Sequence, residues 1–294
     1  MVRVSSEDDL SQGDRYEQIA TKNASIYFGL DFFVINVLFT GFLFIPLERM
    51  FPKNHEQGVF RREWHEDIFY FLVSSLFVQV LAFLALSPGS AVGAAAPLEP
   101  VQSYFGAQPF LIQLALIMLF TDFVQYWLHR AFHQVPALWR FHAVHHSAKS
   151  MDWLAGARMH FIEIIVLRAT TAIPMLSLGF DPNAIQAYIF TVYVYSGFIH
   201  SNVGWDLSRI ERFVVTPRFH HWHHGSEKEA IDVNYAIHFP LPDWLFGTHL
   251  QAEKRWPEKY GIVGVMPRGY WQQFLYPFRK ETDAEKAAKA QKAG

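Results

Sequence analysis

Five apolar stretches, each close to the length of a membrane-crossing helix, restrict the fold of this 294-residue chain more than any other feature. They are Ile26 to Pro46, Ile68 to Leu86, Phe110 to Leu128, Phe161 to Leu178 and Ala184 to Ile199. About 20 apolar residues span the hydrocarbon core of a bilayer. The fourth stretch is interrupted by Glu163 and Arg168, but the first two lack the charged face of an amphipathic surface helix. We therefore predict an all-α bundle of four to five transmembrane helices, in preference to buried helices of a soluble protein; the first stretch either spans or is partly embedded.

The composition supports this class and excludes several others. Charged residues make up 18% of the chain, against about 25% in a typical soluble domain. The net charge of −2 provides no basic surface for nucleic acid. The absence of cysteine excludes disulfides, thiolate zinc sites and thiol catalysis. Any metal ion must therefore be bound through nitrogen or oxygen.

The distribution of Lys and Arg predicts which side of the membrane each loop faces. These residues favour the cytoplasmic side in short loops. They occur after the first stretch and after the third, but the loop between the second and third stretches has none. The second stretch is therefore predicted to cross from the cytoplasm to the outside, and the third to cross back. The fourth and fifth form a hairpin that turns at the sequence GFDPN.

Nine of the 15 histidines come from four separate segments that this topology places on the cytoplasmic side. They are His129, His133, His142, His145, His146, His200, His220, His223 and His224. Because Lys and Arg alone determined the topology, this convergence is independent support for it. We predict a cytoplasmic helical cap that holds a histidine-rich site for two metal ions.

The spacing of these histidines suits metal binding. Residues four apart lie on one helical face, which applies to His129 and His133. The pattern H-x-x-H-H occurs twice, at residues 142–146 and 220–224. Its adjacent histidines diverge by about 100° on a helix and therefore reach different ions. His221 has no counterpart in the first pattern, so we read it as a spacer.

Local signals predict that both patterns are helical. Thr216 is a candidate N-cap, Pro217 follows at the first helical position, and Gly225 follows the last histidine. Pro136 opens the first pattern in a similar way. Nine rings exceed the three protein ligands of a typical catalytic zinc site, and H-E-x-x-H, the metalloprotease signature, is absent. His55, His65, His238 and His249 lack the spacing and remain structural or unassigned.

From about Asp122 to Thr248 the sequence resembles the fatty acid hydroxylase and sterol desaturase superfamily of membrane di-iron oxygenases. The matching segments, in the family's order, are DFVQYWLHRAFH, LWRFHAVHHS, HFIE, HSN, TPRFHHWHH, NYA and DWLFGT. The resemblance implies two iron ions held by the nine histidines, O2 as co-substrate, and a lipid substrate drawn from the bilayer. It also implies an external electron donor, such as a ferredoxin or a small haem protein with its reductase.

The resemblance also implies a division of the chain. We expect a polar N-terminal segment (1–25), a membrane hydroxylase-like domain (26–279) with its histidine core at 122–248, and a charged tail (280–294). Two positions depart from the family: Ser196 stands where acyl hydroxylases can carry a further histidine, and Ala236 replaces a glycine. No fused haem domain is expected. These departures bear on the subfamily rather than on the chemistry.

Five further residues are candidates for contacts around the ligands. Asp122 lies seven residues before His129 in an apolar stretch, and we predict that it orients a ligand ring. His160 and Glu163 are either a tenth ligand with its orienting carboxylate or a polar belt; we favour a supporting role. Asp232 and Asn234 follow the last histidines and are placed to bond their rings.

The leading hypothesis is an oxygenase that hydroxylates or desaturates a fatty acyl chain or sterol, and we favour hydroxylation. One alternative is a membrane zinc hydrolase with Glu163 as its base; the other is a non-catalytic membrane metal-binding protein. Zinc is also possible in purified protein, because it outcompetes ferrous iron for nitrogen ligands. The expected location is the bacterial inner membrane or the endoplasmic reticulum, with the metal site on the cytoplasmic face.

Overall fold

The computed structural model describes residues 30–75, 98–250, 252, 254–262 and 264–280, and the regular elements in these ranges are helices. Four helices are long: α2 (Leu30–Met50), α5 (Phe110–Gln134), α7 (Phe161–Ser177) and α8 (Pro182–His200). The short helices are α4 (Glu99–Gly106), α6 (Pro136–His145), α9 (Pro217–His223), α10 (Leu241–Phe246) and α11 (Tyr270–Leu275). Residues 64–75 are also helical, and 3-10 turns lie at Ala155–Ala157, Lys228–Ala230 and Tyr276–Phe278. The prediction of an all-α fold is confirmed for these residues.

Helix α5 buries several polar side chains and exposes many of its large apolar ones. Its buried face includes Thr121, Asp122 and Gln125. Its exposed large side chains are Phe110, Leu111, Ile112, Leu119, Phe123 and Trp127. A helix of a soluble protein has the opposite arrangement. The outer face of α5 is therefore suited to contact with lipid.

Among the described helices, α5 alone is long and apolar enough to cross a membrane. Helix α7 has 17 residues, among them Glu163 and Arg168. Much of the second apolar stretch lies outside the described residues. The expectation of four to five membrane-crossing helices, and of a cytoplasmic cap, is therefore not confirmed.

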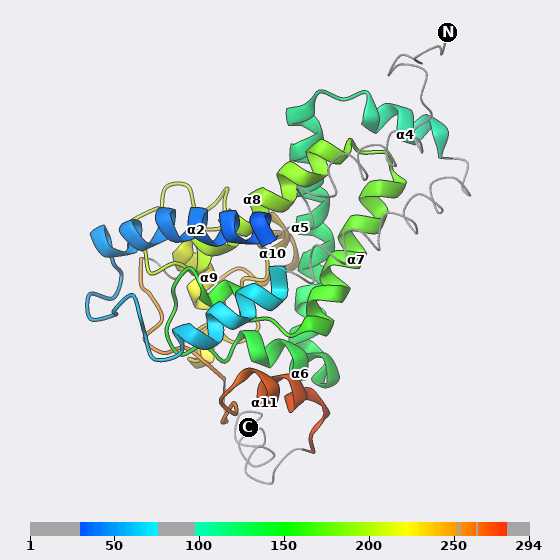
Figure 1. Ribbon diagram of the computed structural model, residues 1–294. Coiled ribbons are helices and arrows are strands. Elements are labelled where there is room, and N and C mark those ends of the chain that lie inside the picture. The colour runs from blue at the N-terminus through cyan, green and yellow to red at the C-terminus, as the bar shows by residue number, and fades with distance from the viewer. Residues whose placement is uncertain (1–29, 76–97, 251, 253, 263, 281–294) are drawn as a thin grey trace.

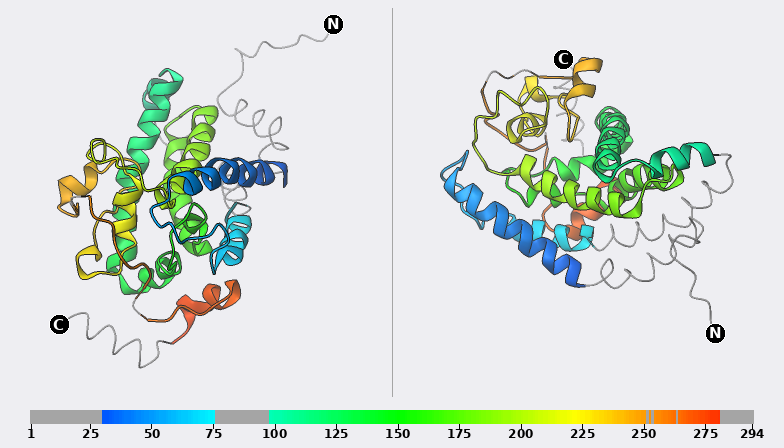
Figure 2. Two further views of the ribbon diagram at one scale, coloured as in Figure 1. Left: turned by 90° about the vertical axis from the view of Figure 1, so that its left-hand side faces the viewer. Right: turned by 90° about the horizontal axis from the view of Figure 1, so that it is seen from above.

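Helices α5, α7 and α8 pack against one another, and α2 crosses α8 (Figures 1 and 2). Their shared core includes Ile117, Met175, Phe180 and Tyr188. The chain reverses between α7 and α8 where the sequence predicts a hairpin: Gly179 has a φ of +80°, and Asp181 accepts a hydrogen bond from the Asn183 amide at the start of α8. This hairpin sets the C-terminal end of α8 beside the start of α7.

The four histidine-bearing segments meet at one end of these long helices. Pro136 forces the residue before it into an extended conformation, so α5 ends at Gln134 and α6 turns back against it. Helix α9 packs against α8. Figure 1 shows α6 and α9 below the crossing α2, where the lower parts of α5 and α7 lie. The chain turns therefore place residues distant in sequence around one site.

Candidate metal centre

The nine predicted histidines form two adjacent groups. His129, His133, His142, His146 and His223 form the first group, and His145, His200, His220 and His224 form the second. Within each group the ligand atoms lie within 4.8 Å of one another. Both are buried apart from the partly exposed His133. The rings of His146 and His224 stack at 4.3 Å between centroids, which places the two groups side by side.

Each H-x-x-H-H pattern divides between the two groups. His142 and His146, four residues apart, belong to the first group, whereas His145 belongs to the second. In α9 the assignment is reversed: His220 and His224 belong to the second group and His223 to the first. Adjacent histidines therefore reach different groups, as the helical period predicts.

The local helix signals explain how α9 presents its rings. The Thr216 hydroxyl accepts a hydrogen bond from the Phe219 amide at 3.3 Å, and Pro217 occupies the first turn. Both features were predicted from the sequence. His221, read as a spacer, belongs to neither group. Its Nε2 contacts the carbonyl oxygens of His200 and Ser201, at 3.2 and 3.0 Å, and thereby attaches α9 to the end of α8.

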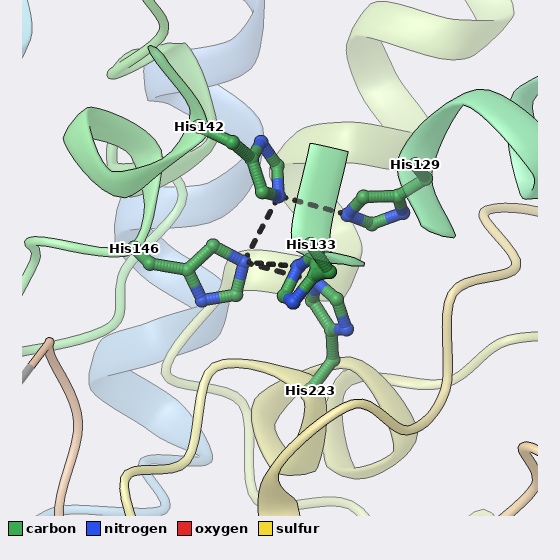
Figure 3. A group of neighbouring side chains, drawn as sticks. All are labelled: His129, His133, His142, His146 and His223. Atoms are coloured by element: carbon green, nitrogen blue, oxygen red, sulfur yellow. Dashed lines mark hydrogen bonds between the residues drawn. The ribbon is translucent and has the colours of Figure 1, made fainter. Parts of the chain in front are cut away.

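The Nε2 atoms converge at distances that fit ligands around an ion. In the first group, Nε2 of His146 lies 3.0 Å from that of His142, 3.1 Å from that of His133 and 3.0 Å from that of His223 (Figure 3). In the second group, Nε2 of His220 lies 3.0 Å from that of His200 and 3.2 Å from that of His224. Nitrogen ligands about 2.1 Å from a metal ion are about 3.0 Å apart when they occupy neighbouring octahedral positions.

The opposite ring nitrogens are held by acceptors outside the groups. Nδ1 of His129 donates to the Tyr235 carbonyl at 2.7 Å, and Nδ1 of His142 donates to the Glu163 carboxylate at 2.6 Å. Equivalent bonds reach backbone carbonyls from His145 (to Arg158), His200 (to Ser196) and His223 (to Val233). A proton held at Nδ1 leaves the Nε2 lone pair directed inward. Five of the nine rings therefore have the tautomer that metal ligation requires.

Burial favours the neutral form of the rings outside the long helices. Desolvation is the main cause that lowers the pKa values of six of them well below the ordinary 6.5, and neighbouring histidines lower them further. These rings are His142, His145, His146, His220, His223 and His224. Neutral imidazole is the metal-binding form, so the site holds its donors ready for an ion at neutral pH.

A buried ion-pair network supports the second group from outside. The Arg158 guanidinium donates to Asp67 at 2.5 Å and to Glu63 at 3.0 Å. Arg61 also binds Asp67, and it donates to Asp152 at 2.6 Å. The network fixes the segment whose Arg158 carbonyl accepts a hydrogen bond from Nδ1 of His145. Sequence reasoning did not find these supports, because neither a backbone carbonyl nor an ion pair between distant segments has a signal in the local sequence.

Two of the five supporting candidates lie at a ligand ring. Glu163 accepts from His142, and an Asp232 oxygen lies 3.5 Å from Nδ1 of His133. Asn234 does not contact a ring: it donates to the Phe219 carbonyl and accepts from the Leu250 amide. His160 is not a tenth member of the groups. It caps α7 by accepting from the Ile162 amide, and its Nε2 faces the Phe274 carbonyl.

The prediction that Asp122 orients a ligand ring is wrong. Its carboxylate accepts bonds from the backbone amides of His238 and Phe239 and from Nδ1 of His238. The loop before α10 folds over this face of α5, and its residues bind the Asp122 carboxylate. The spacing between Asp122 and His129 had suggested that a ligand ring would bind it instead. His238, which had no assigned role, is therefore the partner of Asp122.

A cavity reaches both histidine groups. His129 and His142 of the first group and His145, His200 and His220 of the second line it. Its apolar walls are formed mainly by Phe71, Phe132, Trp153, Ile164, Leu167, Val192 and Ile199. Gly156 also lines it, and a Cβ there would lie 2.8 Å from Nδ1 of His200. The cavity brings an apolar space to the edge of a nitrogen-rich centre.

The sequence comparisons agree with this geometry. Residues 114–248, which contain all nine histidines, match the model of the fatty acid hydroxylase family. Over this histidine-bearing segment the chain matches the fatty acid hydroxylase family. This confirms the resemblance seen in the histidine motifs.

The chain is similar to three kinds of curated relative. It is 29% identical over 238 residues to the ornithine lipid hydroxylase OlsE of Rhizobium tropici. The aligned region covers 80% of this chain and 72% of that protein. It is 31% identical over 128 residues to human alkylglycerol monooxygenase, of which it covers 28%. It is 28% identical to a putative methylsterol monooxygenase of Dictyostelium discoideum, over 76% of this chain and 86% of that protein. No solved structure matches the chain.

These relatives establish the general class of the protein. They are named as hydroxylases and monooxygenases, which are oxidoreductases. The prediction that the chain is an oxidoreductase is confirmed. Together with α5, they also indicate association with a membrane.

Proposed function

We propose that this protein is a membrane-bound di-iron monooxygenase that hydroxylates a lipid. The observation that carries the proposal is the pair of histidine-only groups, five and four rings, which both line one apolar cavity. Imidazole ligands suit iron as well as zinc and copper, and the names of the relatives favour oxygen chemistry on lipids. We assign the nine histidines as ligands of two ions.

The iron pair, when bound, would supply the activation of O2. The overall reaction R–H + O2 + 2 electrons + 2 protons gives R–OH + H2O. Because the two electrons come from outside, the reaction requires a donor such as a ferredoxin or a small haem protein with its reductase. We favour hydroxylation over desaturation because the relatives are hydroxylases and monooxygenases.

The chain's own residues hold the substrate and exclude water. Trp153, Leu167 and Val192 line the cavity and can pack against an alkyl chain. His142 and His145 border the same space, so a carbon of that chain can lie beside both histidine groups. Glu163 and the carbonyl of Arg158 keep these two rings in the ligating tautomer.

The side of the membrane on which the histidine groups lie is also part of the proposal. The apolar outer face of α5 suits lipid, and we place the histidine-bearing end on the cytoplasmic side because Lys and Arg gather in its loops. A soluble electron donor would then reach the site from the cytoplasm. A bacterial inner membrane and the endoplasmic reticulum both satisfy this arrangement.

The test begins with metal content per chain, by plasma mass spectrometry on protein purified gently from iron-replete cells. We expect about two irons, lost in a His145→Ala His223→Ala double variant because these residues belong to different groups. The iron-loaded protein, a chemical reductant and 18O2 are then incubated with membrane lipids. Incorporation of 18O into a lipid supports the proposal; lipid cleavage without oxygen would instead establish a zinc hydrolase, and one metal or none would overturn the two-ion site.

A further inference from the structure

His238 is a buried histidine that stands apart from both groups. It precedes α10 and is 1% exposed. Asp122 on α5 holds it in place: Oδ1 accepts from the His238 amide at 2.9 Å and from its Nδ1 at 3.0 Å, and Oδ2 accepts from the Phe239 amide at 2.6 Å. These three bonds join a loop to a helix more than 100 residues away in the sequence. The pair is therefore built to hold one ring at one position.

His238 also borders the cavity that reaches both histidine groups. His238 lines the cavity together with Gln125, Val192 and Tyr195. Tyr195 packs against the ring at 5.4 Å, but its hydroxyl donates to the Val215 carbonyl. Among the described residues, no hydrogen-bond partner reaches Nε2 of His238, although the atom is buried. An unsatisfied buried polar atom in a native structure requires an explanation, and a ligand in the cavity provides one.

The bond to Asp122 determines what kind of group Nε2 can bind. A carboxylate only accepts hydrogen bonds, so Nδ1 carries a proton, and in the neutral ring Nε2 presents a lone pair. We propose that Nε2 of His238 accepts a hydrogen bond from a hydroxyl of the lipid held in the cavity, and that Asp122 acts as a positioning residue for this contact. The inference deepens the proposed function and rests on it, since it names the substrate as a hydroxyl-bearing lipid.

The location separates this role from metal binding. The aromatic neighbours of His238 are Tyr188, Tyr195 and Phe239, none of which belongs to a histidine group. The same cavity is lined by His129 and His200. A lipid whose hydroxyl is bound at His238 would therefore have its alkyl part directed along the apolar walls toward the histidine groups. The hydrogen bond would select which carbon lies beside the metals.

The experiment uses the metal-loaded full chain in detergent and two probes of equal chain length, 1-hexadecanol and 1-methoxyhexadecane. The alcohol can donate a hydrogen bond, but the ether cannot. Competition against radiolabelled 1-hexadecanol measures both dissociation constants. We expect the wild-type protein to bind the alcohol about five- to ten-fold tighter, the worth of one hydrogen bond. His238→Leu should remove this preference, whereas His249→Leu, a histidine stacked on Trp244 outside the cavity, should retain it.

A second variant tests the tautomer. In Asp122→Asn the amide nitrogen can take the place of Oδ1 and donate to Nδ1, which moves the ring proton to Nε2, an effect known for Asp–His pairs in enzymes; the nitrogen NMR shifts of the ring report whether the proton has moved. Nε2 then donates, so the ether should bind nearly as tightly as the alcohol. A merely structural role for the pair would not improve binding of the ether. Metal content and thermal unfolding of each variant establish that it has folded, and His238→Gln, which can still accept, should keep most of the preference.

Equal binding of both probes by the wild-type protein, or an unchanged preference in His238→Leu, would overturn the inference. If His238→Leu does not fold, the inference would be overturned by an Asp122→Asn protein that carries the ring proton on Nε2 and still has the wild-type preference. Because the readout is binding, it does not depend on turnover. If the protein keeps the alcohol preference but incorporates no 18O, that result counts against the oxygenase proposal alone. If it incorporates 18O normally but shows no alcohol preference, that result counts against the role of His238 alone.

Discussion

Glu163 on α7 accepts a 2.6 Å hydrogen bond from Nδ1 of His142 on α6. Both side chains are buried, at 1% and 2% exposure, so the bond forms without competition from water. It holds the His142 proton at Nδ1 and directs Nε2 toward those of His129 and His146, each 3.0 Å away. A carboxylate on one helix thus sets the ligating tautomer of a ring on another.

Replacing Glu163 by Gln should therefore weaken the binding of a metal ion to the first histidine group. The amide can donate to Nδ1 and reverse the tautomer, and loss of such an orienting partner typically costs 10- to 100-fold in metal affinity or activity. Chelator titration with mass-spectrometric readout measures the affinity. Glu66→Gln is the control, because Glu66 is a buried carboxylate that accepts from Gln273 and the Gly269 amide, away from the histidines. Wild-type metal retention in Glu163→Gln would contradict the prediction.

His220 and His221 are neighbours on α9 with different expected roles. His220→Gln removes a member of the second group, so we expect metal content to fall from about two ions to about one per chain. His221→Gln should leave two ions, because His221 bonds Tyr260 and backbone carbonyls instead. The same mass-spectrometric measurement checks both variants. Equal metal loss in the two would refute the division into groups.

Gly156 leaves the space that His200 needs. A Cβ at this position would lie 2.7 Å from the Ser196 hydroxyl and 2.8 Å from Nδ1 of His200, so Gly156→Ala must displace that ring. Overpacking of this kind costs about 1–3 kcal/mol. We expect a lower unfolding midpoint and about one metal ion lost per chain. Gly58→Ala, where the added Cβ meets nothing within 4 Å, should remain within about 0.5 kcal/mol of wild type.

Acid should destabilise the metal-free protein. Burial lowers the pKa values of His142, His145 and His146 on α6 below the ordinary 6.5, so the unfolded chain binds more protons than the folded one below that pH. The contribution of these rings to stability is therefore fully present above about pH 6.5 and is lost as the pH falls below it. The urea midpoint of chelator-treated protein should be lower at pH 5.5 than at pH 7.5. A midpoint that stays constant or rises would show that these rings are not buried as neutral groups.

Much of the site was predictable because its signals are local. The i, i+4 spacing of His129 and His133 and the two H-x-x-H-H patterns depend only on the helical period, and the rings do divide as that period requires. The Thr216 cap and the turn at Gly179 also depend on a few adjacent residues. These features needed no knowledge of distant packing.

The errors concern side chains whose partners come from elsewhere in the chain. Asp122 lies on the expected face of α5, but the loop at His238 and Phe239 folds onto that face and takes both carboxylate oxygens. Asn234 likewise bonds the Phe219 carbonyl rather than a ring. Spacing along a helix identifies the face on which a side chain lies but not what packs against it.

The sequence by itself determined the helical class, the nine histidines and the separation of adjacent rings, because hydrophobic runs and helical periodicity are properties of neighbouring residues. Only the tertiary structure decided that the rings gather into groups of five and four, that Glu163 and backbone carbonyls bind the Nδ1 atoms of five rings, and that His238 pairs with Asp122 and lines the cavity. These relationships are contacts between elements far apart in the chain. They depend on how α5, α6, α8 and α9 pack together, which no local pattern specifies.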